Sequence, residues 1–306
     1  MAGSPHSRAG SPGGGLAAHY DGFLRSLASK RPETRGTYGR ALREFLRWHA
    51  RKRTPGLTTG DVRRYKKHLV RAKGLTSVSV STYLTAVRRF CAYLVRRRVL
   101  EENPALVVEG NSRPRAHSRA PLTAAEAGAL LAALDRSGER GARDCAFITL
   151  MLTCGLSEIE IIRADAGDIV RDEGGARLLV QGKGRVRKDQ AVALTGDALA
   201  ALEQYIALRP KLADTDPLFA SAGNRTRGTR MTTRGVRDRV SRSLARAGLR
   251  SSARRRITPY SLRHTAALLL AGSGATADEI RSRMRLGSLS TAKLYIAQTR
   301  DNRTDA

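Results

Sequence analysis

The stretch from position 258 to position 295 decides the fold, with TPYSLRHT at 258–265 and LSTAKLY at 289–295. Two helix-like segments join these motifs, so Arg263 of the first can come close to Tyr295 of the second. A guanidinium can clamp a phosphate, and a phenol can act as a nucleophile. The pairing predicts chemistry on a phosphate ester.

The charge balance indicates which phosphate is involved. Lysine and arginine number 56 against 27 aspartates and glutamates, which gives a net charge of +29 over 306 residues. Such a field attracts polyanions, and nucleic acid is the expected partner. No apolar run approaches the roughly 20 residues of a membrane span. The N-terminus also lacks the apolar core of a signal peptide, so we expect no membrane partner.

Cysteine and histidine usage argues against a bound metal. The three cysteines, Cys91, Cys145 and Cys154, are far apart and odd in number, which suits a reducing cytosol and argues against a disulfide framework. The six histidines show no metal-ligand spacing. We therefore expect no metal and no cofactor, and a cytoplasmic, nucleoid-associated location.

Composition and periodicity divide the chain into four parts. Residues 1–15 are rich in Gly, Ser and Pro and predict a disordered tail. Residues 16–108 predict a helical domain, with helices starting near positions 16, 34, 58 and 78. Residues 109–120 predict a basic linker, which fits a protein whose two halves grip opposite sides of a duplex. Residues 121–306 predict a second domain.

The second domain is predicted to be helical around a small sheet. Strands are expected at 168–170, 177–180 and 191–194, and a turn at Gly182-Lys183-Gly184 precedes the last of them. Helices are expected at 124–134, 145–154, 197–207, 233–247, 261–272, 277–284 and 290–296. The predicted fold class is mainly α with a small antiparallel β-sheet.

The order and spacing of motifs in both halves resemble the tyrosine recombinases, the phage-integrase family. The N-terminal block is similar to the helical, SAM-like core-binding domain of that family, and residues 121–298 are similar to its catalytic domain. The matching residues of the first block are Thr37-Tyr38, Phe45-Leu46, Thr59-Gly60-Asp61-Val62, Tyr83-Leu84, Val87-Arg88-Arg89-Phe90 and Asn103-Pro104.

The resemblance implies a site-specific DNA recombinase or integrase. Such enzymes break and rejoin duplex DNA through a 3′-phosphotyrosyl link, without metal or nucleotide. Tyr295 matches the family's nucleophile, and Arg263 matches its second arginine. Lys183 matches a hairpin lysine that protonates the leaving 5′-oxygen. His264, which follows Arg263, is expected to be structural rather than an acid–base group.

Three positions depart from the family's pattern. Ser157 stands where the first arginine is expected, and loss of a charged donor removes roughly 3 kcal/mol or more of transition-state stabilisation. Tyr260 replaces a histidine but can still donate to a phosphate oxygen, so it remains a catalytic candidate. Leu286 replaces a histidine or tryptophan; if the segment is two residues shorter, Ser288 takes that place.

The sequence leaves open which residue replaces the missing arginine. The family's glutamate falls on Glu160 in this register. Arg163 lies six residues beyond Ser157 on a different helical face, which makes it a poor candidate. Arg185, Arg187 and Arg285 all remain possible.

Three hypotheses for function follow from the matches and the departures. The first is a recombinase or integrase, typical of mobile elements. The second is a catalytically impaired or inactive relative that binds DNA in an architectural or regulatory role. The third is a topoisomerase-like enzyme that nicks and relaxes DNA. The separate helical N-terminal block favours half-site recognition and hence recombination, and retention of Lys183 and Tyr295 favours activity.

Basic residues on both domains are candidates for DNA contact. They are Lys66, Lys67, Arg88 and Arg89 in the first domain, and Arg185 and Arg187 beside the predicted hairpin. The resemblance further implies double-stranded DNA with an inverted repeat as the partner. It implies two protomers on each site and four in a synaptic complex.

Overall fold

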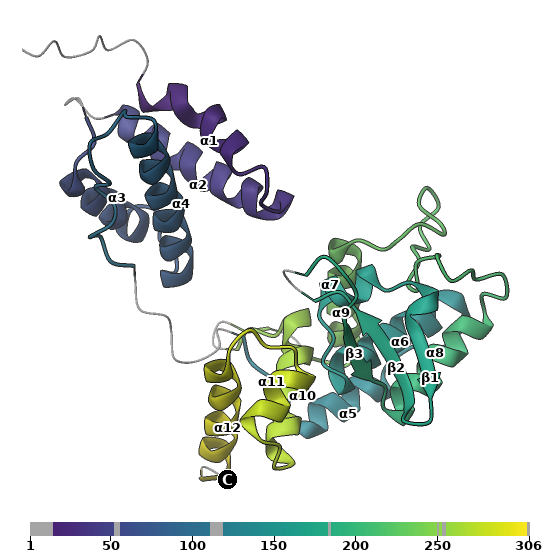
Figure 1. Ribbon diagram of the computed structural model, residues 1–306. Helices are drawn as coiled ribbons and strands as arrows, with labels where there is room; N and C mark the ends of the chain where they lie inside the picture. The colour runs from purple at the N-terminus through teal and green to yellow at the C-terminus, as the bar shows by residue number, and fades with distance from the viewer. Residues whose placement is uncertain are drawn as a thin grey trace, which may run out of the picture. The chain divides into compact units, whose positions relative to one another are not determined.

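The computed structural model describes residues 15–51, 56–110, 119–182, 185–249, 251–252 and 255–304, without the side chains of 301–304. It contains two compact units, Met1–Arg115 and Ala116–Ala306 (Figure 1). Most of the predicted tail and of the predicted linker lies outside the described residues, and so does Lys183.

The first unit is helical, as its periodicity predicts. Its elements are the 3₁₀ turn η1 (Leu16–His19), α1 (Tyr20–Ser26), α2 (Pro32–Ala50), α3 (Thr59–Arg71) and α4 (Ser77–Arg96). The start of α3 shows how local chemistry sets these bounds. The Thr58 hydroxyl accepts from the Asp61 N–H at 3.2 Å, and the Asp61 carboxylate accepts from the Thr58 N–H at 2.8 Å. This capping box pairs two N–H groups that a helix start otherwise leaves without partners.

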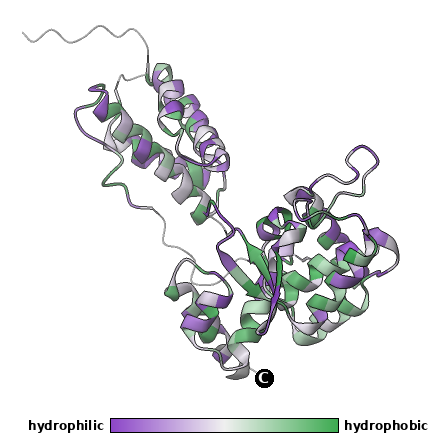
Figure 2. Ribbon diagram, turned by 45° about the vertical axis from the view of Figure 1, so that its right-hand side comes forward, coloured by the Kyte–Doolittle hydropathy of each residue, from purple (hydrophilic) through white to green (hydrophobic). Residues whose placement is uncertain are grey.

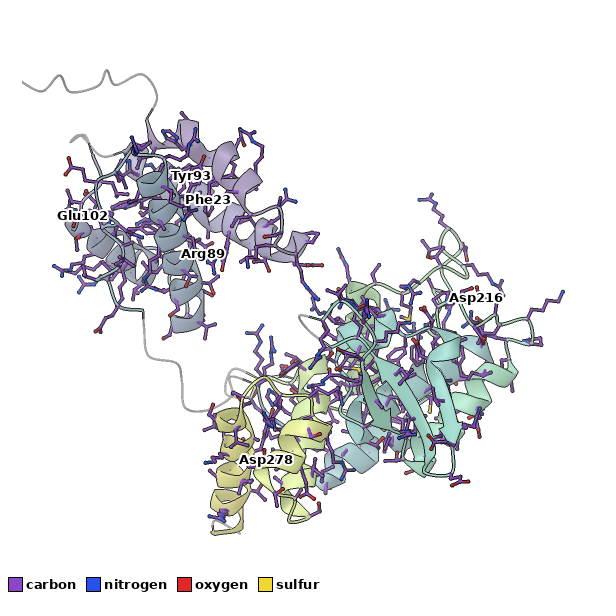
Figure 3. The ribbon with its side chains drawn as sticks, viewed as in Figure 1. Phe23, Arg89, Tyr93, Glu102, Asp216 and Asp278 are labelled. Carbon is purple, nitrogen blue, oxygen red and sulfur yellow. The ribbon has the colours of Figure 1, made fainter. Side chains whose placement is uncertain are left out.

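Aromatic side chains from all four helices meet in the core of the first unit. Phe45 of α2, Tyr65 of α3 and Phe90 of α4 are fully buried. Phe23 of α1 packs edge-on against Phe90 and Tyr93, with ring centroids 5.4 and 5.9 Å apart. Figure 3 labels Phe23 and Tyr93 at this contact. The core therefore depends on burial of large rings, the residues with the greatest apolar area.

One basic and one apolar side chain of this unit lie in environments that their residue types do not suggest. Arg88 does not simply face outward, because its Nε donates to the Ala105 carbonyl at 3.1 Å and its Nη2 to the Val108 carbonyl at 2.5 Å. It thereby ties the segment that follows α4 back onto α4. Val70, although apolar, is 43 % exposed, and it follows Leu69, the last buried residue of α3.

The second unit contains three strands among eight α-helices within its described residues. In chain order these are α5 (Ala124–Ala132), α6 (Gly138–Thr153), α7 (Glu158–Arg163), the 3₁₀ turn η2 (Ala166–Asp168), β1 (Ile169–Asp172), β2 (Gly175–Val180), β3 (Gln190–Ala193), α8 (Gly196–Ala207), α9 (Thr233–Arg246), α10 (Pro259–Gly272), α11 (Ala277–Arg283) and α12 (Leu289–Thr304). The fold class predicted from the sequence is confirmed.

The three strands form an antiparallel sheet in the order β1-β2-β3. Leu178 at the centre of β2 lies opposite Ile169 of β1 and Val192 of β3. Leu178 and Val192 are buried in the core that α6 and α8 share. In Figure 2 hydrophobic residues concentrate in the sheet and in the helices of this unit, with hydrophilic residues mostly outside. The connection from β2 to β3 spans positions 181–189 and therefore includes Lys183.

The sequence predicted that this helix begins at Cys145, but α6 begins at Gly138. The first turns of α6 lack a regular apolar pattern because a buried ion pair occupies positions that would otherwise be apolar. Arg143 and Asp144 are only 3 % and 6 % exposed and are joined at 2.6 Å, and Arg143 also donates to the Ala220 carbonyl at 2.8 Å. Buried charges of this kind occur where they are paired and hydrogen-bonded.

A second, smaller apolar cluster lies between α10, α11 and α12. It contains Ala266, Ala267, Ile280, Met284, Ala292 and Tyr295. Small alanines on α10 and α12 let these helices approach closely, so the tyrosine ring becomes part of the packing. None of the helices in the described part of the chain is long and apolar enough to cross a membrane.

The core of the first unit provides a test of this fold. Phe90→Ala should lower its free energy of unfolding by about 3–5 kcal/mol, because the fully buried ring leaves a cavity. Trp48, the single tryptophan, lies in this unit, so its fluorescence during urea unfolding reports on this unit. Val78→Ala is the control, since Val78 is 57 % exposed on the same helix and should change stability by less than about 0.5 kcal/mol. Equal effects of the two substitutions would contradict the packing described above.

Candidate active site

Arg263 is held inside the second unit by the start of α10. At the start of this helix the Thr258 N–H donates to the Ser261 hydroxyl at 3.0 Å, and Pro259 lies in the first turn, which fixes the backbone that carries Arg263. The side chain is only 8 % exposed. Its Nη1 donates to the Gly155 carbonyl at 2.6 Å and to Glu160 Oε2 at 3.0 Å, and its Nη2 donates to the Met284 carbonyl. Arg263 is thus locked in one orientation before any substrate arrives.

Ser157, at the position where the resemblance expects an arginine, caps α7. Its hydroxyl donates to Glu160 Oε2 at 2.8 Å, and its backbone N–H donates to the same oxygen at 2.7 Å. The Glu160 N–H in turn donates to the Ser157 hydroxyl at 3.4 Å. Ser157 therefore orients the glutamate and supplies no positive charge of its own.

Arg285 follows α11 and reaches the same glutamate. Its Nε donates to Glu160 Oε1 at 2.6 Å, and its Nη2 donates to Glu160 Oε2 at 3.1 Å and to the Gly155 carbonyl at 2.9 Å. Its side chain is only 3 % exposed. Of the three arginines that the sequence left open, Arg285 is the one that lies beside Arg263. Two guanidinium groups therefore share one carboxylate and one carbonyl.

Glu160 remains ionised in this setting. Burial alone would raise the pKa of its carboxyl group. The hydrogen bond and charge of Arg285, together with the charge of Arg263, outweigh burial and hold the pKa below its usual value of 4.5. Burial also lowers the pKa of Arg263, which the negative charge of Glu160 opposes. The resulting cluster has two cations and one anion, and so keeps a net positive charge.

Glycine is strongly favoured at position 155, at the base of this cluster. Its φ of +63° lies in the left-handed region that favours glycine. A Cβ there would also meet Met284 Cε at 2.5 Å. The left-handed turn presents the Gly155 carbonyl to both guanidinium groups, which places an uncharged acceptor between two like charges.

A cavity of about 810 Å³ opens beside the two arginines. Five arginines outnumber two glutamates in its lining, which includes Ser157, Glu158, Glu160, Arg185, Arg237, Tyr260, Arg263, Arg281, Arg285 and Leu286. Tyr260 and Leu286, two of the positions that depart from the family's pattern, both line the cavity, and Leu286 contributes an apolar wall without a donor. The cavity is suited to an anionic group.

Tyr295 lies on α12 and does not line this cavity. Its ring is 2 % exposed, and its hydroxyl lies 2.6 Å from His264 Nδ1. The His264 ring also packs against Tyr260 at a centroid distance of 4.7 Å. Burial and the nearby Tyr260 raise the pKa of Tyr295, and the charge of Arg263 only partly offsets them. The phenol is therefore neutral here, and it is hydrogen-bonded to His264, the residue that follows Arg263.

The hairpin between β2 and β3 carries the remaining basic candidates of this unit. Lys183 lies outside the described residues. Arg185 is exposed, pairs with Asp189 at 2.7 Å and lines the cavity, whereas Arg187 is exposed and does not line it. Lys188 is held by Asp165 at 2.5 Å and by Asp168, so it serves the fold of the hairpin base.

Candidates for DNA contact in the first unit differ in exposure and in the contacts that their side chains already make. Lys67 is exposed, whereas Lys66 donates to the Glu109 carbonyl at 3.0 Å. Arg89 is exposed on α4 (Figure 3), with its guanidinium 5.7 Å from the centre of the Tyr38 ring. Arg88 is occupied by the two carbonyls described above. Among the residues described, no group of three His, Cys, Asp or Glu side chains could hold a metal ion.

Family models match both units. The model of the phage integrase family matches residues 121–302, and the model of the phage integrase N-terminal SAM-like domain matches residues 19–98. Among curated proteins, tyrosine recombinase XerC of Neisseria meningitidis serogroup C is 28% identical over 290 residues, covering 92% of this chain and 91% of that protein. XerC of Myxococcus xanthus is 31% identical over 219 residues, covering 71% and 70%.

Solved structures share the fold at low sequence identity. The XerH site-specific recombinase in a post-cleavage complex with palindromic difH substrate has a TM-score of 0.72 at 18% identity, covering 94% of this chain and 83% of that one. A lambda integrase dimer bound to a COC′ core site has a TM-score of 0.68 at 18% identity, covering 92% and 77%.

The shared carboxylate gives a prediction for stability. Glu160→Gln should lower the free energy of unfolding of the second unit by about 3–5 kcal/mol at pH 7, because two buried cations lose their counter-charge. Glu158→Gln on the same helix is the control, since its partner Arg237 is largely exposed and the pair should contribute less than about 1 kcal/mol. Urea unfolding followed by circular dichroism measures both.

The pH dependence has a definite sign. The folded-state pKa of Glu160 lies below the usual 4.5, so its contribution is complete above that pH and is lost as the pH falls through the folded-state pKa. The stability difference between the native protein and Glu160→Gln should therefore shrink on acidification. A difference that does not depend on pH would contradict an ionised Glu160.

Proposed function

Because the chain belongs to the phage integrase family of tyrosine recombinases, we propose that it is a site-specific recombinase or integrase that cleaves and rejoins duplex DNA through a 3′-phosphotyrosyl intermediate. The observation that carries this proposal is the packing of α10 on α12. It holds the Tyr295 hydroxyl against His264, one residue from the buried Arg263. A nucleophile and a phosphate clamp thus lie within one small structural block.

The chemistry divides among three side chains. Arg263, which lines the cavity, holds non-bridging oxygens of the scissile phosphate, and its charge stabilises the crowded phosphorane. The Tyr295 oxygen attacks phosphorus as the phenol passes its proton to a water molecule. The bond to the 5′-oxygen breaks, and that oxygen takes a proton to become a hydroxyl. Attack by the 5′-hydroxyl of another strand reverses the step, so the phosphodiester energy is conserved.

Lys183 is the proposed general acid for the leaving oxygen. Its place in the chain, on the connection between antiparallel strands β2 and β3, agrees with the hairpin lysine that the resemblance implies. An ammonium group beside a phosphate can donate a proton when desolvation lowers its pKa. Tyr260, at the cavity wall, is proposed to donate a hydrogen bond to a phosphate oxygen.

Tyr295 must leave its resting place before it can react. Its ring is enclosed by the α10–α12 cluster, and only the short segment 284–288 separates α11 from α12. We propose that DNA binding moves α12 about this segment, which brings the phenol to the cavity. The energy for breaking its contact with His264 then comes from binding.

The proposed partners are double-stranded DNA with an inverted repeat and further copies of the chain. The net charge of +29 supports the first. The lambda integrase structure is a dimer on its core site, which supports a dimer on each site here. Two such dimers brought together make the proposed tetrameric synapse. We propose a cytoplasmic, nucleoid-associated location on the same basis.

Covalent trapping tests the function. Nicked duplexes with randomised half-sites are incubated with the native protein, and DNA that stays attached in SDS is sequenced to recover the site. We expect a covalent adduct with native protein and none with Tyr295→Phe, which keeps the packed ring but lacks the oxygen. A mobility shift confirms that the variant still binds.

The outcomes of this experiment separate the hypotheses. An adduct that persists in Tyr295→Phe would eliminate Tyr295 as the nucleophile. Native protein that shifts the duplex but never forms an adduct would support the architectural or regulatory role. Relaxation of supercoiled plasmid without strand exchange between two recovered sites would support the topoisomerase-like activity.

Neighbouring arginines on α4 give a matched prediction for DNA contact. Arg89→Gln should reduce the slope of log K against log salt concentration by about 0.9, because an exposed cation is removed from phosphate. Arg88→Gln should instead lower the stability of the first unit by about 1–3 kcal/mol, since the Ala105 and Val108 carbonyls lose their donor. Salt titration of binding and Trp48 fluorescence measure the two effects. The reverse assignment would show that Arg88 contacts DNA.

A further inference from the structure

We propose that Arg285 takes over the role of the arginine missing at position 157, as the second cation of the phosphate site beside Arg263. This inference rests on the proposed function and adds a residue to its site. The family pattern places the first arginine at the start of α7. In this chain the charge instead reaches the same place from the end of α11.

The convergence of the two guanidinium groups is the first argument. Arg263 and Arg285 both donate to the Gly155 carbonyl and to Glu160 Oε2, at 2.6 to 3.1 Å. Ser157, the position vacated by arginine, bonds to that same glutamate oxygen. Arg285 therefore shares the Glu160 carboxylate both with Ser157 and with Arg263.

The backbone at Arg285 is the second argument. Arg285 has a φ of +50°, and Arg98 is the only other non-glycine with positive φ among the described residues. The Arg285 N–H donates to the Ser282 carbonyl at 3.0 Å, and the Leu286 N–H donates to the Arg281 carbonyl at 2.8 Å. These bonds form a Schellman motif, whose left-handed position is usually glycine. This turn fixes the point at which the Arg285 side chain leaves the end of α11, from where its Nε reaches Glu160 Oε1 at 2.6 Å.

The remaining donors are the third argument. A guanidinium has five N–H groups. Arg285 uses its Nε and both Nη2 hydrogens on Glu160 and Gly155, and one Nη1 hydrogen on the Arg283 carbonyl at 2.6 Å. One Nη1 hydrogen has no acceptor within the described residues. Arg285 also lines the cavity, so this N–H and the charge are available to a phosphate oxygen there.

The other candidates fit this role less well. Arg185 is exposed and pairs with Asp189, and Arg237 is largely exposed and pairs with Glu158. Arg187 and Arg163 do not line the cavity. An exposed, mobile cation is less effective than a buried one, because only a preorganised donor in a low-dielectric site stabilises the transition state without reorganisation.

The test measures single-turnover cleavage of a suicide substrate. This substrate carries the DNA site that covalent trapping with the native protein recovers. Arg285→Gly should still fold, because Arg263 remains as the counter-charge of Glu160 and glycine relieves the left-handed backbone. It should cleave about 100-fold more slowly at saturating protein. Arg98→Gly is the matched control, since it removes the same charge at the same type of backbone position, with a φ of +57° in the first unit. It should cleave at the native rate once bound.

A second-site change distinguishes a functional from a structural role. Ser157→Arg added to Arg285→Gly should restore cleavage at least about tenfold, because it places a guanidinium where the family pattern has one. Thermal melting is measured in parallel for all variants. Rescue of the cleavage rate in excess of any rescue of melting temperature is the expected result.

Each outcome decides between the proposals. Native protein without an adduct overturns the proposed function, and this inference with it. A native adduct together with cleavage by Arg285→Gly at the rate of Arg98→Gly overturns the inference alone. So does a slow Arg285→Gly that Ser157→Arg fails to rescue, since Arg285 would then support Glu160 without replacing the missing cation.

Discussion

The carboxylate of Glu160 is the constraint on which the catalytic unit depends. It joins the start of α7 to an arginine of α10 and an arginine that follows α11 (Figure 1). Two cations with no anion between them would repel each other in a buried setting, and burial would disfavour both charges. The glutamate therefore makes a cluster of positive charge possible inside a folded protein, and Ser157 aligns the glutamate by capping its helix.

This arrangement explains how a chain can lack one of its family's arginines and retain the site. The electrostatic requirement is a rigid positive charge near the phosphate, and the element that supplies it is free to vary. In this chain the end of α11 supplies it, at the expense of a strained backbone at Arg285. The negative charge of Glu160 can balance a second cation whether that cation comes from α7 or from the end of α11.

Much of the fold could be predicted from the sequence because its helices carry regular apolar stripes, as Phe45, Tyr65 and Phe90 show. The family and the fold class were also predicted correctly. The failures have physical causes. Arg143 and Asp144 form a buried pair that interrupts the apolar pattern of α6, and Arg88 turns inward to backbone carbonyls. No sequence pattern distinguished Arg285 from Arg185 or Arg187, because its location depends on a left-handed residue and on contacts distant in the chain.

The enclosure of Tyr295 between α10 and α12 has a consequence for how such a protein scans a chromosome. A strongly basic chain spends most of its time on non-specific DNA, where every nucleotide offers a phosphorus atom. With its oxygen against His264 and its ring in an apolar cluster, the residue stays out of reach of the strands being searched. Accidental nicks are then limited by the displacement of one helix and not by how tightly the protein holds the duplex.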